Sequence, residues 1–256
     1  MIFRADQQPV PFTSETKTQP PHDVPDRPIA EHLPSGPGSD LLIDLMERSR
    51  PLFADHPVNR ARIAAGKKPA TQIWLWGQGR SPTVTSFARE YGPRGAIVSA
   101  VDLVRGTGML IGWDRIDAPG ATGYLDTDYA SKGRTGIDAL KTHDLVCVHI
   151  EAPDEASHEG RVDEKVRALE RIDEHIVGPL LQALPKHGDW RIFISPDHRT
   201  TLRTRAHAYG AVPFVAAGTG IEPRGQTNYD EPTAAASDLQ FDPGWKLMRW
   251  FLGREQ

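Results

Sequence analysis

The chain has 256 residues, a formal net charge of −4, 38% apolar residues and 25% charged residues, which is the usage of an ordinary globular protein. The acidic balance argues against a general nucleic-acid surface, and no apolar stretch approaches the ~18 residues that a membrane helix needs. The single cysteine, Cys147, excludes an internal disulfide and is predicted to be a small core residue, and these features together favour a cytoplasmic location.

The first part of the chain carries few strong structural signals. Residues 1–38 are rich in proline and polar side chains, so they have little to bury and are predicted to form an extended loop. A helix is predicted to begin after Ser39 or Asp40, because both residue types cap helices and the leucines that follow recur on one face. An apolar strand is predicted at residues 73–76, with its two tryptophans in the core.

From residue 83 onward, apolar runs alternate with helix-compatible segments. Gly106 and Gly108 are expected to interrupt the segment 102–110. Alternation of this kind predicts an α/β fold with a mostly parallel sheet and helices on both faces. The expected helices cover residues 83–91 and 131–140, and the expected strands cover residues 96–99, 145–150, 191–195 and 213–217.

The longest helix is predicted over residues 162–177. Gly178 and Pro179 are expected to end or kink it, because proline cannot continue the helical hydrogen bonds. Its apolar residues recur at three- and four-residue steps and therefore share one face: Val162, Val166, Leu169, Ile172 and Ile176.

Carboxylates and imidazoles follow two of the expected strands. Asp154 and His158 come just after the strand at 145–150, Asp197 and His198 come just after the strand at 191–195, and His207 follows within ten residues. Sites in parallel sheets gather at the carboxyl ends of the strands. Because Asp and His are ligands for divalent ions such as manganese and zinc, the five residues predict a metal site.

Each half of this group also has a simpler interpretation. Asp154 and His158 lie four residues apart and would face the same way on a helix, but Asp154 could equally be a helix cap and His158 a surface residue. Asp197 and His198 are neighbours, and neighbouring side chains often point apart. That divergence suits two ions ~3.5–4 Å apart, which can together hold a phosphoryl group.

The pattern His-x-Glu-Ala-x-Asp-Glu-x-x-His-x-Gly at residues 149–160 resembles the archaeal-type phosphoglycerate mutases that need no 2,3-bisphosphoglycerate, which belong to the alkaline phosphatase superfamily. The resemblance spans roughly residues 55–250 and keeps the order of its motifs. The other matching segments are 74–79, 99–108, 119–123, 126–132, 195–198, and His207 with 212–214.

This resemblance implies an alkaline phosphatase-like fold and two divalent metal ions, with manganese favoured and zinc, cobalt or iron as alternatives. Asp154, His158 and His207 would hold one ion, and Asp197 and His198 would help to hold the second. The implied reaction interconverts 3-phosphoglycerate and 2-phosphoglycerate through a phosphoserine intermediate, in glycolysis and gluconeogenesis. No 2,3-bisphosphoglycerate is required.

The resemblance also implies an aspartate and a nucleophilic serine near the family's N-terminus, and neither is found in this sequence. Gly38-Ser39-Asp40 looks superficially like the nucleophile segment, but its surroundings do not match, so Ser39 is interpreted as a helix cap. We therefore expect a fold whose N-terminal part is missing, with little mutase activity by itself. The expected division gives residues 1–70 as a proline-rich loop and remnant of an inserted domain, and residues 71–256 as the C-terminal part of the metal-binding domain.

Six further residues are candidates for supporting roles. Arg80, Arg105 and Lys132 could bind the phosphate or carboxylate of the substrate, although a surface ion pair or a solvated helix position explains each of them too. Glu151 and Glu155 are expected to orient the metal-binding imidazoles, although either could equally cap the long helix, and His149 is expected to support the ligands or pack in the core rather than to bind metal.

Two other functions stay open on the same residues. A phosphohydrolase or phosphotransferase would use the same metal ligands, because these hold the phosphoryl group and not its acceptor, and an inactive metal-binding remnant would keep them without turnover. The expected partner is a small phosphorylated substrate, with no nucleic acid and no membrane. Homo-oligomerisation and completion by a separate N-terminal segment are both left open.

Overall fold

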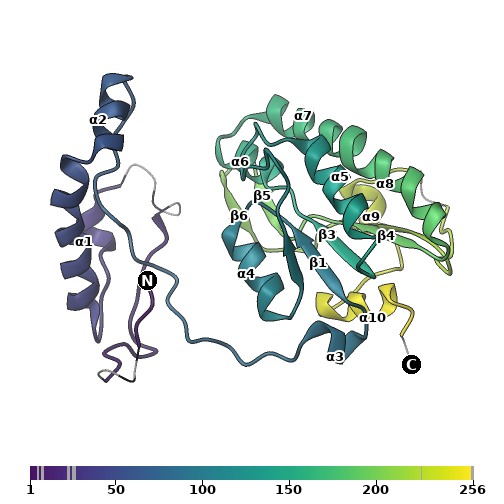
Figure 1. Cartoon of the computed structure of the whole chain (residues 1–256), viewed down its shortest axis with the longest axis horizontal. Coiled ribbons are helices and arrows are strands. Elements are labelled where there is room, and N and C mark those ends of the chain that lie inside the picture. The colour runs from purple at the N-terminus through teal and green to yellow at the C-terminus, as the bar shows by residue number, and fades with distance from the viewer. Residues whose placement is uncertain (5, 7–8, 22–23, 25–26, 226, 255–256) are drawn as a thin grey trace. The chain divides into compact units, whose positions relative to one another are not determined.

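The computed structural model describes residues 1–4, 6, 9–21, 24, 27–225 and 227–254. By its internal contacts the chain divides into two units, Met1–Pro82 and Thr83–Gln256. The division falls later than the expected one at residue 70, because residues 73–78 make their hydrogen bonds within the first unit. Figure 1 labels the α-helices of both units and the strands β1, β3, β4, β5 and β6.

The helical elements are η2 (Ile29–His32), α1 (Ser39–Ala54), α2 (Pro57–Ala64), α3 (Phe87–Tyr91), α4 (Asp102–Leu110), α5 (Tyr129–Ala139), α6 (Ala152–His158), α7 (Val162–Ile172), η3 (Asp173–Val177), α8 (Gly178–Ala183), η4 (Leu184–His187), α9 (Glu231–Ala235), η5 (Gly244–Lys246) and α10 (Leu247–Phe251). The strands are β1 (Gly95–Val98), β2 (Asp114–Ile116), β3 (Leu145–Val148), β4 (Arg191–Ile194), β5 (Arg199–Thr201), β6 (Ala206–Ala208) and β7 (Val215–Gly218).

The first unit is built around α1, which begins at Ser39 with Gly38 in the preceding position, so Ser39 is not itself the cap. Leu42 and Met46 are the buried apolar residues of this helix, as its sequence pattern predicts. The proline-rich segment before it contains one isolated bridge, between Lys17 and Ser35, and otherwise lacks strand pairing among the residues described there.

The strand predicted at residues 73–76 is wrong. The Ile73 N–H donates to the Ser49 hydroxyl at 2.9 Å, and the Trp74 indole N–H donates to the Gln19 carbonyl at 2.7 Å, so these groups are satisfied without a strand ladder. Trp76, which was expected in the core, is 48% exposed. An apolar run alone does not make a strand when no partner strand lies beside it.

The second unit contains the parallel sheet that the alternating pattern predicts. Its order is β2-β1-β3, all parallel, with Ile97 opposite Cys147 and Val98 opposite Val148. Every residue of the central strand β1 is buried. The pair β4-β7 is antiparallel, and β5-β6 forms a separate antiparallel hairpin.

Helices cover both faces of this sheet, as predicted. A Cβ at Gly136 of α5 would lie 2.7 Å from Val148, and a Cβ at Gly108 of α4 would lie 2.8 Å from Ile97. Ile97 and Val98 are neighbours on β1, and Val98 is in register with Val148, so the two helices pack on opposite faces (Figure 1). The prediction that the glycines interrupt residues 102–110 is wrong, because Gly108 lies inside α4 and permits its close approach to β1.

The long predicted helix is present as α7 and continues through the π-helical turn η3 into α8, so Gly178 and Pro179 do not end it. Ile176 is buried and Ile172 packs beside it, against a core that includes Tyr129 and Ala152. The other three members of the predicted apolar face are about half exposed: Val162, Val166 and Leu169.

Candidate metal centre

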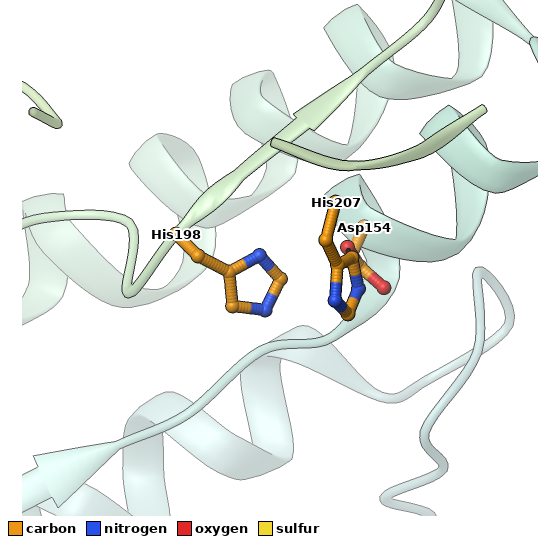
Figure 2. A group of neighbouring side chains, drawn as sticks. All are labelled: Asp154, His198 and His207. Atoms are coloured by element: carbon orange, nitrogen blue, oxygen red, sulfur yellow. Dashed lines mark ion pairs between the residues drawn. The ribbon is translucent and has the colours of Figure 1, made fainter. Parts of the chain in front are cut away.

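Three side chains from three different segments converge in the second unit. One ligand atom each of Asp154, His198 and His207 can be chosen so that all lie within 4.8 Å of one another. The His207 Nε2 atom is 3.6 Å from Asp154 Oδ1, and the rings of His198 and His207 have centroids 4.1 Å apart. Figure 2 shows the three side chains facing one another.

His158 joins this cluster from the second turn of α6. Its Nε2 atom is 3.2 Å from Asp154 Oδ2 and 3.1 Å from His207 Nε2. Its other ring nitrogen, Nδ1, is 2.9 Å from the carbonyl oxygen of Arg205. A carbonyl only accepts, so Nδ1 donates to Arg205, and Nε2 is the ring nitrogen that faces Asp154 and His207.

Local structure explains why these residues meet. Strand β3 leads into α6, where the four-residue spacing of Asp154 and His158 places both on one side of the helix. Strand β4 leads to His198, and the β5-β6 hairpin then brings His207 back beside it. The spacing of Asp154 and His158 is visible in the sequence, whereas the return of His207 depends on the hairpin.

Asp197 lies at the edge of the group. Its Oδ1 atom accepts the backbone N–H of His198 at 3.0 Å, and its Oδ2 atom is 3.7 Å from His198 Nε2. Its charge also raises the pKa of His149, opposing the larger lowering by burial. The structure therefore gathers all five predicted metal residues near the carboxyl ends of β3 and β4, and their role as ligands stays a prediction.

The donor set fits a divalent ion. The Nε2 atoms of His158 and His207 are 3.1 Å apart, and two lone pairs at that distance need either a proton on one ring or a cation bound by both. The carboxylate of Asp154 lies beside both rings, which favours the cation electrostatically. Carboxylate and imidazole together suit manganese, zinc, cobalt or iron.

A buried ammonium group contacts the backbone just after the end of β3. Lys132 of α5 is 1% exposed, and its Nζ atom donates to the carbonyl oxygens of Thr122 and His149, each at 3.3 Å. Burial lowers the pKa of Lys132 to about 8, with Glu151 opposing the fall. A largely unneutralised cation in this position is suited to binding an anionic ligand.

His149 links two further polar side chains. Its Nδ1 atom is 3.2 Å from the Ser99 hydroxyl, and its Nε2 atom is 3.3 Å from Glu151 Oε2. Burial lowers the pKa of His149 and raises the pKa of the Glu151 carboxyl. Burial, followed by repulsion from Asp154, likewise raises the pKa of Glu155. His149, Glu151 and Glu155 therefore feel the charges of the cluster, and their role in orienting its ligands stays a prediction.

The two arginines have different surroundings. Arg105 of α4 donates from Nε to the Ser99 carbonyl, and its guanidinium lies 3.3 Å from an Asp117 oxygen, so it is held by the protein itself. Arg80 is exposed and belongs to the first unit, so it is not among the residues that the second unit brings together. Substrate binding by either residue stays a prediction.

Sequence reasoning missed two residues at the site. Ser99 closes the buried strand β1 and contacts His149, and Thr200 lies between Asp154 and His198. Thr200 follows His198 by two residues at the start of a strand, which places both side chains on one face, and that spacing was the available signal.

Comparisons with known proteins agree with this site. Residues 39–238 match the profile of the Metalloenzyme superfamily, and residues 1–59 match that of 2,3-bisphosphoglycerate-independent phosphoglycerate mutase. A protein of that name from Methanothrix thermoacetophila is 48% identical over 90% of this chain, and a probable one from Geobacter sulfurreducens is 45% identical over 92%. The resemblance inferred from the motifs is confirmed.

A solved structure shows the same fold. The PH0037 protein from Pyrococcus horikoshii superposes with a TM-score of 0.70 and 25% identity, covering 85% of this chain and 58% of that one. The chain spans 59% of the length of both the Methanothrix and the Geobacter relatives. Among the residues that the structure describes, no helix has both the length and the apolar character needed to cross a membrane.

Proposed function

Because this chain belongs to the Metalloenzyme superfamily, we propose that it supplies the metal-binding and substrate-binding groups for interconversion of 3-phosphoglycerate and 2-phosphoglycerate without 2,3-bisphosphoglycerate. The two relatives carry the name of that activity. The reaction belongs to glycolysis and gluconeogenesis, and we place it in the cytoplasm.

One observation carries this proposal: a carboxylate and three imidazoles from α6, the β4–β5 connection and β6 converge within hydrogen-bond or near-contact distance. We assign Asp154, His158 and His207 to one ion, and Asp197 and His198 to a second. Manganese is the proposed metal. Ions bound there would supply charge neutralisation for a phosphoryl group and would favour the ionised form of an attacking hydroxyl.

The chain's own residues would complete the binding of an acidic substrate. Lys132 presents the ammonium group that best fits a phosphate or carboxylate, since its Nζ atom is buried and bonded only to two carbonyl oxygens among the residues described. His149 contacts both Ser99 and Glu151, which fixes its ring between the lysine and the metal ligands. Arg105 braces the backbone of Ser99 and thereby the end of β1.

The proposed reaction passes through a phosphoserine. Ser99 contacts His149, but its hydroxyl also accepts the Val101 N–H at 3.1 Å and so closes the turn between β1 and α4, and we assign it a structural role. We therefore assign the nucleophile to the part of the relatives' length that this chain does not span. On this proposal the 256-residue chain binds metal and phosphoglycerate but does not interconvert the two isomers at an enzymatic rate.

The metal assignment is tested by titrating Mn²⁺ into the purified chain by calorimetry. We expect binding in the wild type and its loss or strong weakening in His158→Ala and Asp197→Ala. His187→Ala is the matched control, because His187 is exposed in η4, just before the amino end of β4. Equal metal affinity in the wild type and both site variants would contradict the assignment.

Turnover is tested separately with ³¹P NMR of 3-phosphoglycerate in the presence of Mn²⁺ and the wild-type chain. Binding without formation of 2-phosphoglycerate is expected. Rapid formation of 2-phosphoglycerate would show that the nucleophile lies within these 256 residues, whereas release of inorganic phosphate would favour a phosphohydrolase.

A further inference from the structure

We propose that Thr200 is the positioning residue of the metal centre: its hydroxyl orients the Asp154 carboxylate and determines which ring nitrogen of His198 carries the proton. This inference rests on the proposed function, because it assigns a role beside the proposed ligands. It concerns a residue that the motifs do not single out.

Thr200 is held in place by its own strand, by the partner strand and by a helix. It is 8% exposed, in strand β5, and pairs directly with His207 across the β5-β6 hairpin. The Nζ atom of Lys165, from α7, donates to its carbonyl oxygen at 3.2 Å. Because the backbone of Thr200 is fixed in this way, its side chain points steadily toward Asp154 and His198.

The hydroxyl of Thr200 contacts two proposed ligands at once. It donates to Asp154 Oδ1, and its Oγ1 atom lies 3.3 Å from His198 Nδ1. An ionised carboxylate accepts hydrogen bonds and cannot donate them, so the single hydroxyl proton points to Asp154. Toward His198 the hydroxyl oxygen is therefore an acceptor, and the proton must come from Nδ1.

This arrangement selects one tautomer of His198. With the proton on Nδ1, the Nε2 atom carries the lone pair that a metal ion requires. The Arg205 carbonyl likewise holds a proton on Nδ1 of His158. The Thr200 hydroxyl accepts the Nδ1 proton of His198, as the Arg205 carbonyl accepts that of His158. The same hydroxyl also donates to the Asp154 carboxylate.

The test uses substitutions that separate the hydroxyl from the shape of the side chain. Thr200→Val keeps the branched shape and removes the hydroxyl, and Thr200→Ser keeps the hydroxyl. Loss of such an outer contact typically weakens metal binding ~10–100-fold, so Thr200→Val should fall in that range for Mn²⁺ and Thr200→Ser should stay close to the wild type.

Thr201→Val is the matched control. Thr201 is the next residue of the same strand, and its hydroxyl contacts Thr204 within the hairpin turn rather than a proposed ligand. Its substitution should leave Mn²⁺ affinity unchanged. Wild-type affinity in Thr200→Val, or an equal loss in Thr201→Val, would overturn the proposal.

A second readout needs no metal. Long-range ¹H–¹⁵N NMR of the metal-free chain should show His198 protonated on Nδ1 in the wild type and a mixture of tautomers in Thr200→Val. If the wild type binds no Mn²⁺, the proposed function fails, yet the tautomer shift still decides the role of Thr200. Should Thr200→Val not fold, Thr200→Ala provides the comparison, and a wild-type His198 protonated on Nε2 would overturn the proposal by itself.

Discussion

Replacing Lys132 by methionine distinguishes an ammonium group kept for a ligand from one kept for the fold. The side chain is 1% exposed, and its Nζ atom has two carbonyl partners at 3.3 Å, which is long for a hydrogen bond to a charged donor. In the part of the chain that the structure describes, it has no carboxylate within ion-pair distance. Methionine keeps a similar length and removes the charge.

The magnitude follows from the pKa. Burial lowers the pKa of Lys132 from 10.5 to about 8, a difference of about 2.5 units, so keeping the ammonium charged in the fold costs about 3 kcal/mol at neutral pH. Losing the two long hydrogen bonds costs roughly 1 kcal/mol for each carbonyl left without this donor. Lys132→Met should therefore raise the free energy of unfolding of the ligand-free chain by about 1 kcal/mol, although it removes a buried polar contact.

The assay is urea unfolding at pH 7 without metal, followed by circular dichroism, together with calorimetric binding of 3-phosphoglycerate in the presence of Mn²⁺. We expect equal or greater stability and a large loss of phosphoglycerate affinity. Lys141→Met is the control, because Lys141 follows the same helix, is largely exposed and pairs with Asp138 at 2.7 Å. It should change neither measurement by more than a small amount.

A loss of more than 2 kcal/mol in stability for Lys132→Met would refute this reasoning, since it would show that the two carbonyl contacts outweigh the cost of burying the charge. Unchanged phosphoglycerate affinity would refute the assignment of the ammonium group to the substrate. The two results are independent, so a variant that is stable and fails to bind supports both steps.

Three further outcomes follow from the second unit. The free energy of unfolding of the wild type should rise between about pH 8 and pH 10.5, by up to ~1.4 kcal/mol per pH unit. In this range the unfolded chain still holds the Lys132 proton, whereas the folded chain has released it. Urea unfolding of Lys132→Met at the same pH values should lack this rise. Gly108→Ala should destabilise α4 by ~1–3 kcal/mol, since its Cβ would lie 2.8 Å from Ile97, whereas Gly106→Ala, in open space, should stabilise by up to ~1 kcal/mol in the same unfolding assay. Burial raises the pKa of the Cys147 thiol to about 11, so iodoacetamide at pH 8 should label it only after unfolding, as mass spectrometry would show.

The parts of the site that could be predicted are those encoded in local spacing. Asp154 and His158 lie one helical turn apart, shortly after an apolar strand. Asp197 and His198 likewise follow an apolar strand. Such patterns predict both the fold class and the edge of the sheet at which side chains gather. The structure brings these residues together, but β4 pairs with β7 outside the three-stranded parallel sheet, so they meet after the ends of strands from two sheets.

What could not be predicted depends on contacts between distant segments. Gly108 was interpreted as a helix breaker because glycine has a low helix propensity, but its missing side chain is what lets α4 approach Ile97. The role of Thr200 depends on the β5-β6 register and on a hydrogen bond to Asp154, which lies 46 residues earlier. Neither the approach of Gly108 to Ile97 nor the hydrogen bond to Asp154 has a local sequence signal, whereas the two-residue spacing of Thr200 and His198 is local.

Several features of the site lower the stability of the ligand-free fold in the same direction. Burial and Asp154 raise the pKa of Glu151, burial lowers the pKa of Lys132, and two imidazole nitrogens from His158 and His207 face each other at 3.1 Å. A cation bound by the imidazoles and Asp154 would favour the ionised form of the neighbouring carboxylates, and an anion at Lys132 would offset the cost of burying the ammonium group. A metal-bound phosphorylated acid would present both charges, so on the proposed function the two groups together favour a phosphoryl substrate more strongly than either group does alone.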